Sequence, residues 1–356
     1  MLCALVPLEL IHASGAAFVR LCAGQRKDAE RGAAELPRDT CPVVLACWGA
    51  LFAAEQPAPE ALDLVVAPIT CDWKARLAQL VGERAPVLSL DVPRRKHSAR
   101  ARALWRAEVA RLRDELGRLA GRKVDREALL RSVRLFRRAT RATRRLVEHM
   151  RSDPPLLRAT EAARVFWTAY WAPMEEWAAA AQALADALDA SPAAEEKPAA
   201  RPRLLLTGSP CVWPNAKVLA VAEEAGAAIV ADETCAGPRP LCDAVALDEP
   251  TLADLLAALA DRYLLPCTCP CFSPNDDRLE RLALLAQRFS VDGAIYHLLR
   301  GCHLYDAELA AVRERLAELN VPVLSIETDY SAEDVEQIRV RVEAFVEMLR
   351  GRQRRR

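Results

Sequence analysis

The sequence lacks most of the short motifs that identify common enzyme classes. No GxGxxG follows a predicted strand, so the dinucleotide fingerprint is missing, and no GxxxxGK(S/T) provides a Walker-type ATP site. GxSxG and HExxH are absent too, as is the CxxC pair of a zinc ribbon. Nucleotide hydrolysis, serine-hydrolase chemistry and zinc proteolysis therefore have no support in this chain.

The chain also lacks excess charge and long apolar runs. Its 49 Lys and Arg balance 49 Asp and Glu, which gives no support for binding nucleic acid or an acidic membrane. No uninterrupted apolar segment reaches the length of a membrane span. The apolar start has no basic segment and contains Glu9 and His12, so it makes a poor signal peptide. We therefore expect a cytoplasmic protein without nucleic-acid or membrane partners.

Cysteine, by contrast, is plentiful, because the 356 residues include 12 of them. A chain of this length with 52% hydrophobic residues can build ordinary cores and does not need disulfides. Since cytoplasmic thiols stay reduced, the surplus indicates metal or redox chemistry.

Apolar runs alternate with helical segments in two parts of the chain. Strands are predicted at 61–69 and 85–93 around a helix at 75–83, which is a βαβ pattern. Further strands are predicted at 203–208, 227–232, 292–299 and 321–327, with helices between them. Ser331 and Asp334 predict a capping box before the last helix. These patterns indicate an α/β fold.

The middle of the chain is helical by its periodicity, with helices predicted at 101–121, 125–150 and 157–190. The second is rich in arginine, and its charged face is either solvated or a partner surface. The third carries an aromatic stripe that we expect in the core, formed by Phe166, Trp167, Tyr170, Trp171 and Trp177. The predicted parts are an N-terminal α/β domain (1–97), a helical region (98–190), a linker (191–202), a C-terminal α/β domain (203–350) and a basic tail (351–356).

Several cysteines follow predicted strands, where loops of parallel sheets line the ligand crevice. They are Cys71, Cys211, Cys235 and Cys302. We expect several such thiols to converge on one crevice in each domain. Cys22 and Cys47 are embedded in apolar segments, so we expect them in the core as small hydrophobic residues.

The segment LLPCTCPCFSPNDDR (264–278) carries Cys267, Cys269 and Cys271 at every second position. Its three prolines prevent regular strand pairing, which predicts a loop that displays thiols. Scattered thiolates that the fold brings together suit an iron–sulfur cluster better than a zinc knuckle. Further ligands could come from His97, His297 and His303, although a lone histidine is more often structural.

Seven segments share the pattern of one protein family. They are CALVPLELIHASGA, LPRDTCPVV, VVAPITCDWK, IVADETCAG, CPCFSPNDDR, DGAIYHLLRGCHLY and IETDYSAEDVEQIRVRVEAFVEML. Together they resemble the 2-hydroxyacyl-CoA dehydratase / benzoyl-CoA reductase family over nearly the whole chain. The CxC before SPN and the RGCH step are most similar to its double-cubane cluster branch. The resemblance implies two flavodoxin-like (Rossmann-like) parallel-sheet domains with a helical region between them, in a homodimer.

The resemblance also implies a cofactor and its ligands. Dehydratases of the family hold a 4Fe–4S cluster with three cysteines, and the matching positions here are Cys41, Cys71 and Cys302. In the double-cubane branch two cubanes share a bridging sulfide and need more thiolates, for which the candidates are Cys3, Cys235, Cys269 and Cys271. Two positions depart from the family, because Cys267 is an extra thiol and Trp73 stands where relatives often have glycine.

The family receives electrons from a separate activator, an ATPase with its own 4Fe–4S cluster, which agrees with the missing ATP site. The leading hypothesis is an iron–sulfur oxidoreductase that reduces a small substrate at a double-cubane (8Fe–9S) cluster, with His303 or Tyr305 donating protons. One alternative is a lyase, a 2-hydroxyacyl-CoA dehydratase subunit with a single 4Fe–4S cluster. The other is a non-catalytic electron carrier that binds a cluster.

Overall fold

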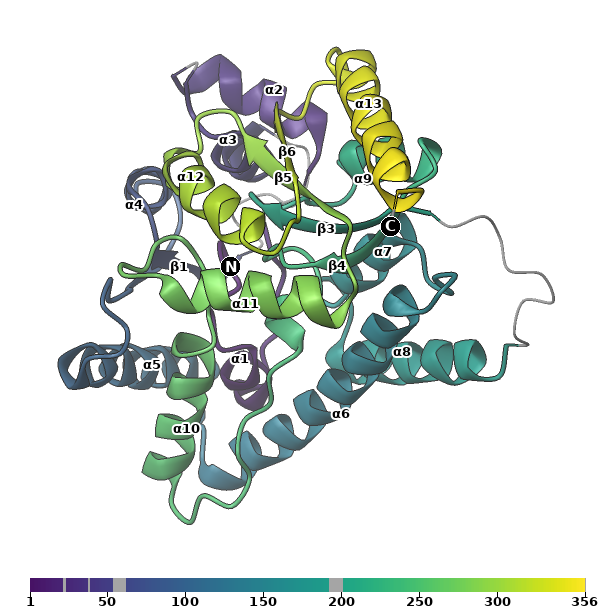
Figure 1. The fold of residues 1–356 in the computed structure, drawn as a ribbon. Helices are drawn as coiled ribbons and strands as arrows, with labels where there is room; N and C mark the ends of the chain where they lie inside the picture. The colour runs from purple at the N-terminus through teal and green to yellow at the C-terminus, as the bar shows by residue number, and fades with distance from the viewer. Residues whose placement is uncertain (22–23, 38, 54–61, 192–200, 356) are drawn as a thin grey trace.

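The computed structural model describes residues 1–21, 24–37, 39–53, 62–191 and 201–355 (Figure 1). The N-terminal part contains α1 (Leu8–Ser14), α2 (Arg26–Glu35), α3 (Pro42–Trp48), η1 (Gly49–Ala53), β1 (Val65–Ile69), α4 (Asp72–Gly82) and β2 (Val87–Asp91). The middle part contains α5 (Ala99–Leu119), α6 (Arg126–Arg151), α7 (Ala159–Thr168) and α8 (Met174–Asp189). The C-terminal part contains β3 (Arg203–Gly208), α9 (Lys217–Glu224), β4 (Ala228–Asp232), η3 (Arg239–Leu241), α10 (Leu252–Leu264), α11 (Asp276–Arg288), β5 (Gly293–Leu299), α12 (His303–Ala317), β6 (Val323–Thr328) and α13 (Val335–Gln353).

Two parallel sheets confirm the predicted α/β fold. β1 and β2 form one sheet, in which Val65 pairs with Val87. The other sheet has the order β4-β3-β5-β6, and all its neighbours are parallel. This is the flavodoxin-like order, in which the chain changes direction across the sheet between β3 and β5. Ligands bind at such a switch point, outside the carboxyl ends of the strands.

Side-chain alternation in β5 shows why its apolar run is continuous. Tyr296 and Leu298 pack in one core with residues of α11 and α12, whereas Ile295 and Leu299 belong to the larger core that includes α9 and α13. A strand that is covered by helices on both faces has no solvent side, so every position of β5 is buried.

The helices of the middle part connect the two sheets. α5 packs against α10 and β2, and α6 packs against α8, α1 and β4. Both begin at a capping side chain, since Ser98 accepts a hydrogen bond from the N–H of Ala101 and Asp125 accepts one from Ala128. In Figure 1 α5 and α6 run below the sheets and away from each other. None of the helices in the described ranges is long and apolar enough to cross a membrane.

Some expectations of local structure were wrong. The helix predicted at 157–190 is two helices, because α7 ends at Thr168 and α8 starts only after Pro173. The helical phase is lost between them, so Trp171 is 46% exposed while the other four aromatic residues of the stripe are buried. The capping box is also wrong, since Asp334 itself is the N-cap of α13 and its carboxylate is held by Lys217 and Thr328.

Other differences concern one helix that was not predicted and the end of the last helix. The sequence patterns gave no prediction for α10, whose N-cap Thr251 accepts a hydrogen bond from the N–H of Asp254. α13 continues to Gln353, so the first residues of the predicted basic tail are helical. Most of the predicted linker (192–200) and Cys22 lie outside the described residues. The domain boundaries as such stay a prediction.

Candidate metal centre

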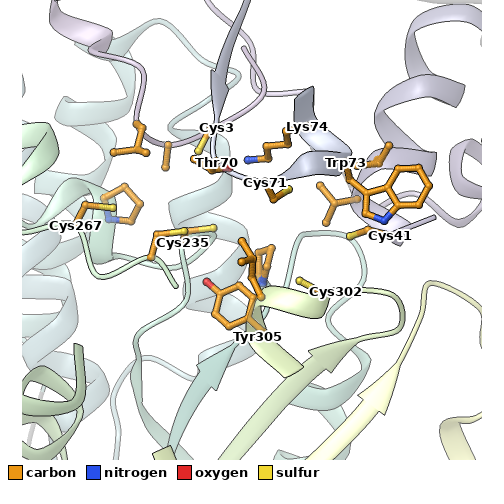
Figure 2. Close-up of a pocket in the computed structure, with 18 of the residues that line it drawn as sticks. Cys3, Cys41, Thr70, Cys71, Trp73, Lys74, Cys235, Cys267, Cys302 and Tyr305 are labelled. Atoms are coloured by element: carbon orange, nitrogen blue, oxygen red, sulfur yellow. The ribbon is translucent and has the colours of Figure 1, made fainter. Parts of the chain in front are cut away.

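A cavity of about 490 Å³ lies at the carboxyl ends of the strands, where loops of both sheets face each other (Figure 2). Seven cysteines line it, namely Cys3, Cys41, Cys71, Cys235, Cys267, Cys269 and Cys302. All are free thiols. Of the four thiols expected after strands, Cys71, Cys235 and Cys302 do converge, but on one cavity shared by both sheets and not on one crevice per domain.

Three of these cysteines form what we call the first group, toward one end of the cavity in Figure 2. Cys41, Cys71 and Cys302 are the N-cap residues of α3, α4 and α12 respectively. The backbone N–H groups of a helix N-terminus and its dipole favour negative charge. The fold therefore places three thiols at helix N-termini, whose dipoles favour the thiolate form, although burial of Cys41 and Cys71 opposes it.

A hydrogen bond within the first group makes one of its thiols more acidic and another less acidic. A hydrogen bond from the thiol of Cys41 lowers the pKa of Cys302 to about 7, and the N–H of Tyr305 contributes to the shift. The same bond raises the pKa of Cys41, which is the donor. Burial raises the pKa of Cys71, although the Lys74 ammonium acts in the opposite direction.

The second group consists of Cys3, Cys235, Cys267 and Cys269. Cys3 reaches the cavity because the chain start runs beside β1, where the N–H of Leu2 donates to the carbonyl of Val66 at 3.0 Å. Cys235 follows β4, and Cys267 and Cys269 lie on the loop after α10. In Figure 2 Cys235 and Cys267 lie at the opposite end of the cavity from Cys41 and Cys302.

In this loop the first two cysteines line the cavity but the third does not. Cys271, a predicted ligand, is buried and does not line the cavity. Its thiol donates to the sulfur of Cys269, which lowers the pKa of Cys269 to about 6 and raises that of Cys271. The extra cysteine, Cys267, lines the cavity instead.

Side chains from other segments fix this loop by its backbone carbonyls. The ammonium of Lys96 is buried and donates to the carbonyls of Leu265 and Cys267. Arg94 donates to the carbonyl of Cys271 at 3.3 Å, and Asn275 donates to that of Cys269 at 3.2 Å. Since the carbonyls are held from behind, the side chains of Cys267 and Cys269 are left facing the cavity.

Cationic side chains surround the sulfurs. Arg20 is almost fully buried and donates to the carbonyl of Cys235 at 2.7 Å and to its sulfur at 3.4 Å. Its guanidinium lies over the rings of Trp167 and Tyr170. Lys74, Arg94 and Arg239 also line the cavity. Sequence reasoning missed these residues, although an arginine inside the apolar run AAFVRL is a signal that it has a buried anionic partner.

The two predicted proton donors lie at different depths. Tyr305 and His303 both line the cavity, but Tyr305 is buried whereas His303 is exposed. Burial and the nearby thiols of Cys269 and Cys235 raise the pKa of Tyr305, so its phenol stays protonated at neutral pH. Among the other histidines, neither His97 nor His297 lines the cavity.

Two cysteines outside the cavity act as core residues. The thiol of Cys47 donates to the carbonyl of Leu21 and that of Cys211 to the carbonyl of Asn215, each at 3.4 Å. Both are buried, which confirms the expectation for Cys47. Cys211 follows a strand as predicted but does not take part in the crevice.

The arrangement suits a cluster rather than a single metal ion. Across the described ranges, no three His, Cys, Asp or Glu side chains converge on one ion position. In a cubane each thiolate binds its own iron, and the thiols here are spread around one cavity, although Cys41 and Cys302 are hydrogen-bonded to each other. Sulfur donors with surrounding cations fit an iron–sulfur cluster, which carries negative charge when held by thiolates.

Fold and site together define a protein with a flavodoxin-like sheet and a thiol-lined cavity between two parallel sheets. A sequence model of the family described as "2-hydroxyglutaryl-CoA dehydratase, D-component" matches residues 3–349. The chain therefore belongs to the 2-hydroxyacyl-CoA dehydratase family.

Individual relatives have related names. The Escherichia coli (strain K12) protein named "Putative dehydratase subunit YjiM" is 33% identical over 98% of this chain and 90% of its own length. The "(R)-phenyllactyl-CoA dehydratase beta subunit" of Clostridium sporogenes is 20% identical over 76% of this chain and 70% of its own length. The "Lactoyl-CoA dehydratase subunit beta" of Anaerotignum propionicum is 23% identical over 96% of this chain and 89% of its own length.

Proposed function

We propose that the protein is an iron–sulfur oxidoreductase that reduces a small substrate at a double-cubane cluster. The observation that carries this proposal is the number of thiols at one cavity, which is seven. A single 4Fe–4S cluster takes at most about four thiolates. Two cubanes joined by one bridging sulfide leave about three irons each for protein ligands, so about six thiolates are needed.

The first group offers three thiols and the second offers four, which is enough for three ligands on each cubane. Cys41, Cys71 and Cys302 would hold one cubane. The second group offers four candidates for three positions, so one of its thiols is spare, and Cys271 is a further candidate through its bond to Cys269. Arg20 and Lys74 would compensate the negative charge of the bound cluster.

When bound, the cluster supplies electrons to the substrate, and this chain's own residues supply the pocket and the proton. Tyr305 is buried at the cavity wall and carries a phenol proton at neutral pH, so we assign it as the first candidate proton donor to substrate. His303 lines the exposed rim of the same cavity and is the alternative donor. The apolar walls of the cavity exclude water from the reaction.

The electrons would come from an ATP-dependent activator with its own 4Fe–4S cluster. The absence of a Walker-type motif from the sequence supports this division of work, since the energy source must then lie in another protein. We further propose a homodimer in the cytoplasm, where thiols stay reduced until the cluster is inserted.

A second candidate is a 2-hydroxyacyl-CoA dehydratase subunit with one 4Fe–4S cluster on Cys41, Cys71 and Cys302. The names of the relatives favour it, because those from Clostridium sporogenes and Anaerotignum propionicum are both acyl-CoA dehydratase subunits. In this case the second group would bind no iron.

The test is anaerobic purification followed by iron and acid-labile sulfide analysis with EPR spectroscopy. The double-cubane proposal expects about eight irons per chain, from four irons per cubane. Adding the activator and ATP should then give reduction of small unsaturated molecules without a CoA thioester. Turnover of a 2-hydroxyacyl-CoA by protein with about four irons per chain would favour the dehydratase. Stoichiometric zinc without sulfide would overturn both.

A further inference from the structure

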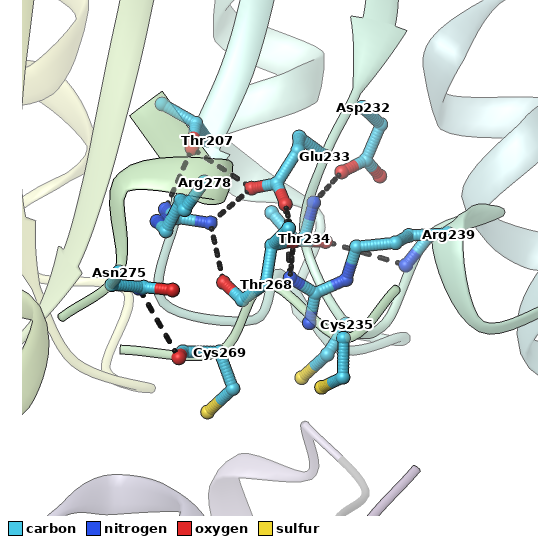
Figure 3. Close-up of polar contacts among 12 residues, drawn as sticks. Thr207, Asp232, Glu233, Thr234, Cys235, Arg239, Thr268, Cys269, Asn275 and Arg278 are labelled. Carbon is cyan, nitrogen blue, oxygen red and sulfur yellow. Dashed lines mark hydrogen bonds and ion pairs between the residues drawn. The ribbon is translucent and has the colours of Figure 1, made fainter. Parts of the chain in front are cut away.

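A buried network of charged side chains lies behind Cys235 and Cys269 of the second group (Figure 3). At its centre is Glu233, which is 1% exposed, and Arg278 is fully buried beside it. Glu233 precedes Cys235 by two positions, at the end of β4. Arg278 lies on α11, just beyond the loop that carries Cys267 and Cys269.

The carboxylate of Glu233 holds that loop with both of its oxygens. Its Oε1 accepts from the hydroxyl of Thr268 at 2.6 Å and from Arg239 at 2.9 Å. Its Oε2 accepts from Arg278 and from the hydroxyl of Thr207, which lies on β3. Thr268 stands between Cys267 and Cys269, so Glu233 contacts the middle residue of the thiol loop.

Arg278 extends the network toward the first group. Its guanidinium donates to the carbonyl of Thr268 at 3.2 Å and, through Nε, to the carboxylate of Glu308 at 2.7 Å. Glu308 lies on α12, the helix that Cys302 caps, and it also accepts from Asn275 at 3.2 Å. One network therefore connects the loop of the second group with the helix that presents a thiol of the first.

Buried charges make this arrangement hard to displace. A carboxylate that is taken out of water must keep its partners, because an unpaired buried charge is strongly unfavourable. If the loop moved outward, Glu233 would lose Thr268 and the two arginines would lose part of their hydrogen bonding. In Figure 3 the sulfurs of Cys235 and Cys269 point to the same side, away from the network.

We propose that Glu233 is a positioning residue that fixes the Cys267–Cys269 loop relative to Cys235 by binding Thr268, Arg239 and Arg278 at once. It holds the sulfurs of the second group at their separation before any cofactor enters. Its charge also offsets those of the arginines, so that they add little positive potential at the sulfurs. The inference rests on the proposed function in so far as that function assigns these thiols to a cluster.

The first test uses the metal-free, reduced protein and so does not depend on the cluster. Thr268→Val keeps the shape of the side chain and removes the hydroxyl that Glu233 binds. The thiols of Cys267 and Cys269, identified by peptide mass spectrometry, should then react with a bulky maleimide about tenfold faster, the factor expected for loss of a hydrogen bond to a charged group. The conservative variant Thr268→Ser should restore the slow rate.

Thr143→Val is the matched control. Thr143 is a fully buried threonine of α6, and its hydroxyl has no hydrogen-bond partner among the residues that the structure describes, so its replacement should leave the labelling rate unchanged. Equal rates in Thr268→Val and Thr143→Val would overturn the inference, whatever the wild type binds. Wild-type protein without iron and sulfide would refute the proposed function, but the labelling rates would still decide the role of Glu233.

A second measurement separates positioning from general stability. Glu233→Gln removes one of the two carboxylates that offset the charges of the arginines. The positive charge near the sulfurs then increases, so the midpoint potential of the loaded protein should rise. Thr143→Val should leave that potential at the wild-type value. A Glu233→Gln protein that folds, loads fully and keeps the wild-type potential would contradict the electrostatic part of the proposal.

Discussion

Removing two thiols from one end of the cavity should cost the protein about half of its iron. The pair Cys41→Ala and Cys302→Ala empties the first group of two of its three sulfurs, and the pair Cys235→Ala and Cys269→Ala does the same to the second. Wild-type protein should contain about eight irons per chain, and each double variant about four, because one cubane keeps its ligands.

The matched control is the double variant Cys47→Ala and Cys211→Ala. Both residues are buried cysteines whose thiols donate to a backbone carbonyl, and neither lines the cavity. Each substitution removes one buried sulfur, which costs about 1 kcal/mol of the free energy of unfolding. A domain with about 5–15 kcal/mol of stability tolerates that loss, so the iron content should stay near wild type.

The assay is anaerobic reconstitution followed by iron and sulfide analysis per folded chain, with the EPR spectrum of the reduced protein. Iron loss in the control equal to that in the ligand variants would show that packing, not ligation, governs loading. Wild-type protein with about four irons, unchanged by Cys235→Ala and Cys269→Ala, would refute the assignment of a second cubane.

Two further predictions concern charge near the site. Arg20→Met removes a cation that contacts Cys235, so the midpoint potential of the loaded protein should fall. The control is Arg84→Met, which replaces an exposed arginine stacked on Trp48 and Phe52 and should not change the potential. An unchanged potential in Arg20→Met would contradict the compensating role of Arg20. His297 is buried and donates to the Ser209 carbonyl, and burial lowers its pKa to about 4 from an ordinary 6.5. Between these values the unfolded chain binds the extra proton, so the free energy of unfolding should fall by about 3 kcal/mol as the pH decreases from 6.5 to 4. Urea titrations should show this part of the pH dependence lost in His297→Gln, and identical profiles for both proteins would disprove it.

The strands could be predicted from the sequence because the residues of each strand themselves indicate that it is buried. Each run with helices on both faces, such as residues 292–299, is apolar at nearly every position, and the structure places β5 there. α10 was not predicted, although Thr251 marks its start and the spacing of Leu255, Leu259 and Tyr263 gives its buried face. Trp171 was misplaced because helical spacing was extended across the break before Pro173.

The site could be predicted only in part, because some of its contacts join residues that are distant in the sequence. Thiols after strands could be assigned to crevices at the strand ends, since sheet topology brings such loops together, but the sequence did not show that both sheets share one cavity. Which of Cys267, Cys269 and Cys271 faces the cavity depends on carbonyl contacts from Lys96 and Arg94, which are distant in sequence. Arg20 reaches Cys235 across 215 positions, and no local pattern specifies such a contact.

The distribution of the first group along the chain has a thermodynamic consequence. Cys41 and Cys302 are separated by roughly 260 residues, so the cofactor that we propose on both would cross-link distant parts of the chain. In the chain-entropy treatment of cross-links, closing a loop of roughly 260 residues lowers the entropy of the unfolded chain by the equivalent of about 5.5 kcal/mol. That amount is comparable to the whole stability of many domains. Chains that have lost their metal would therefore unfold far more often than loaded ones, and proteases would remove them selectively.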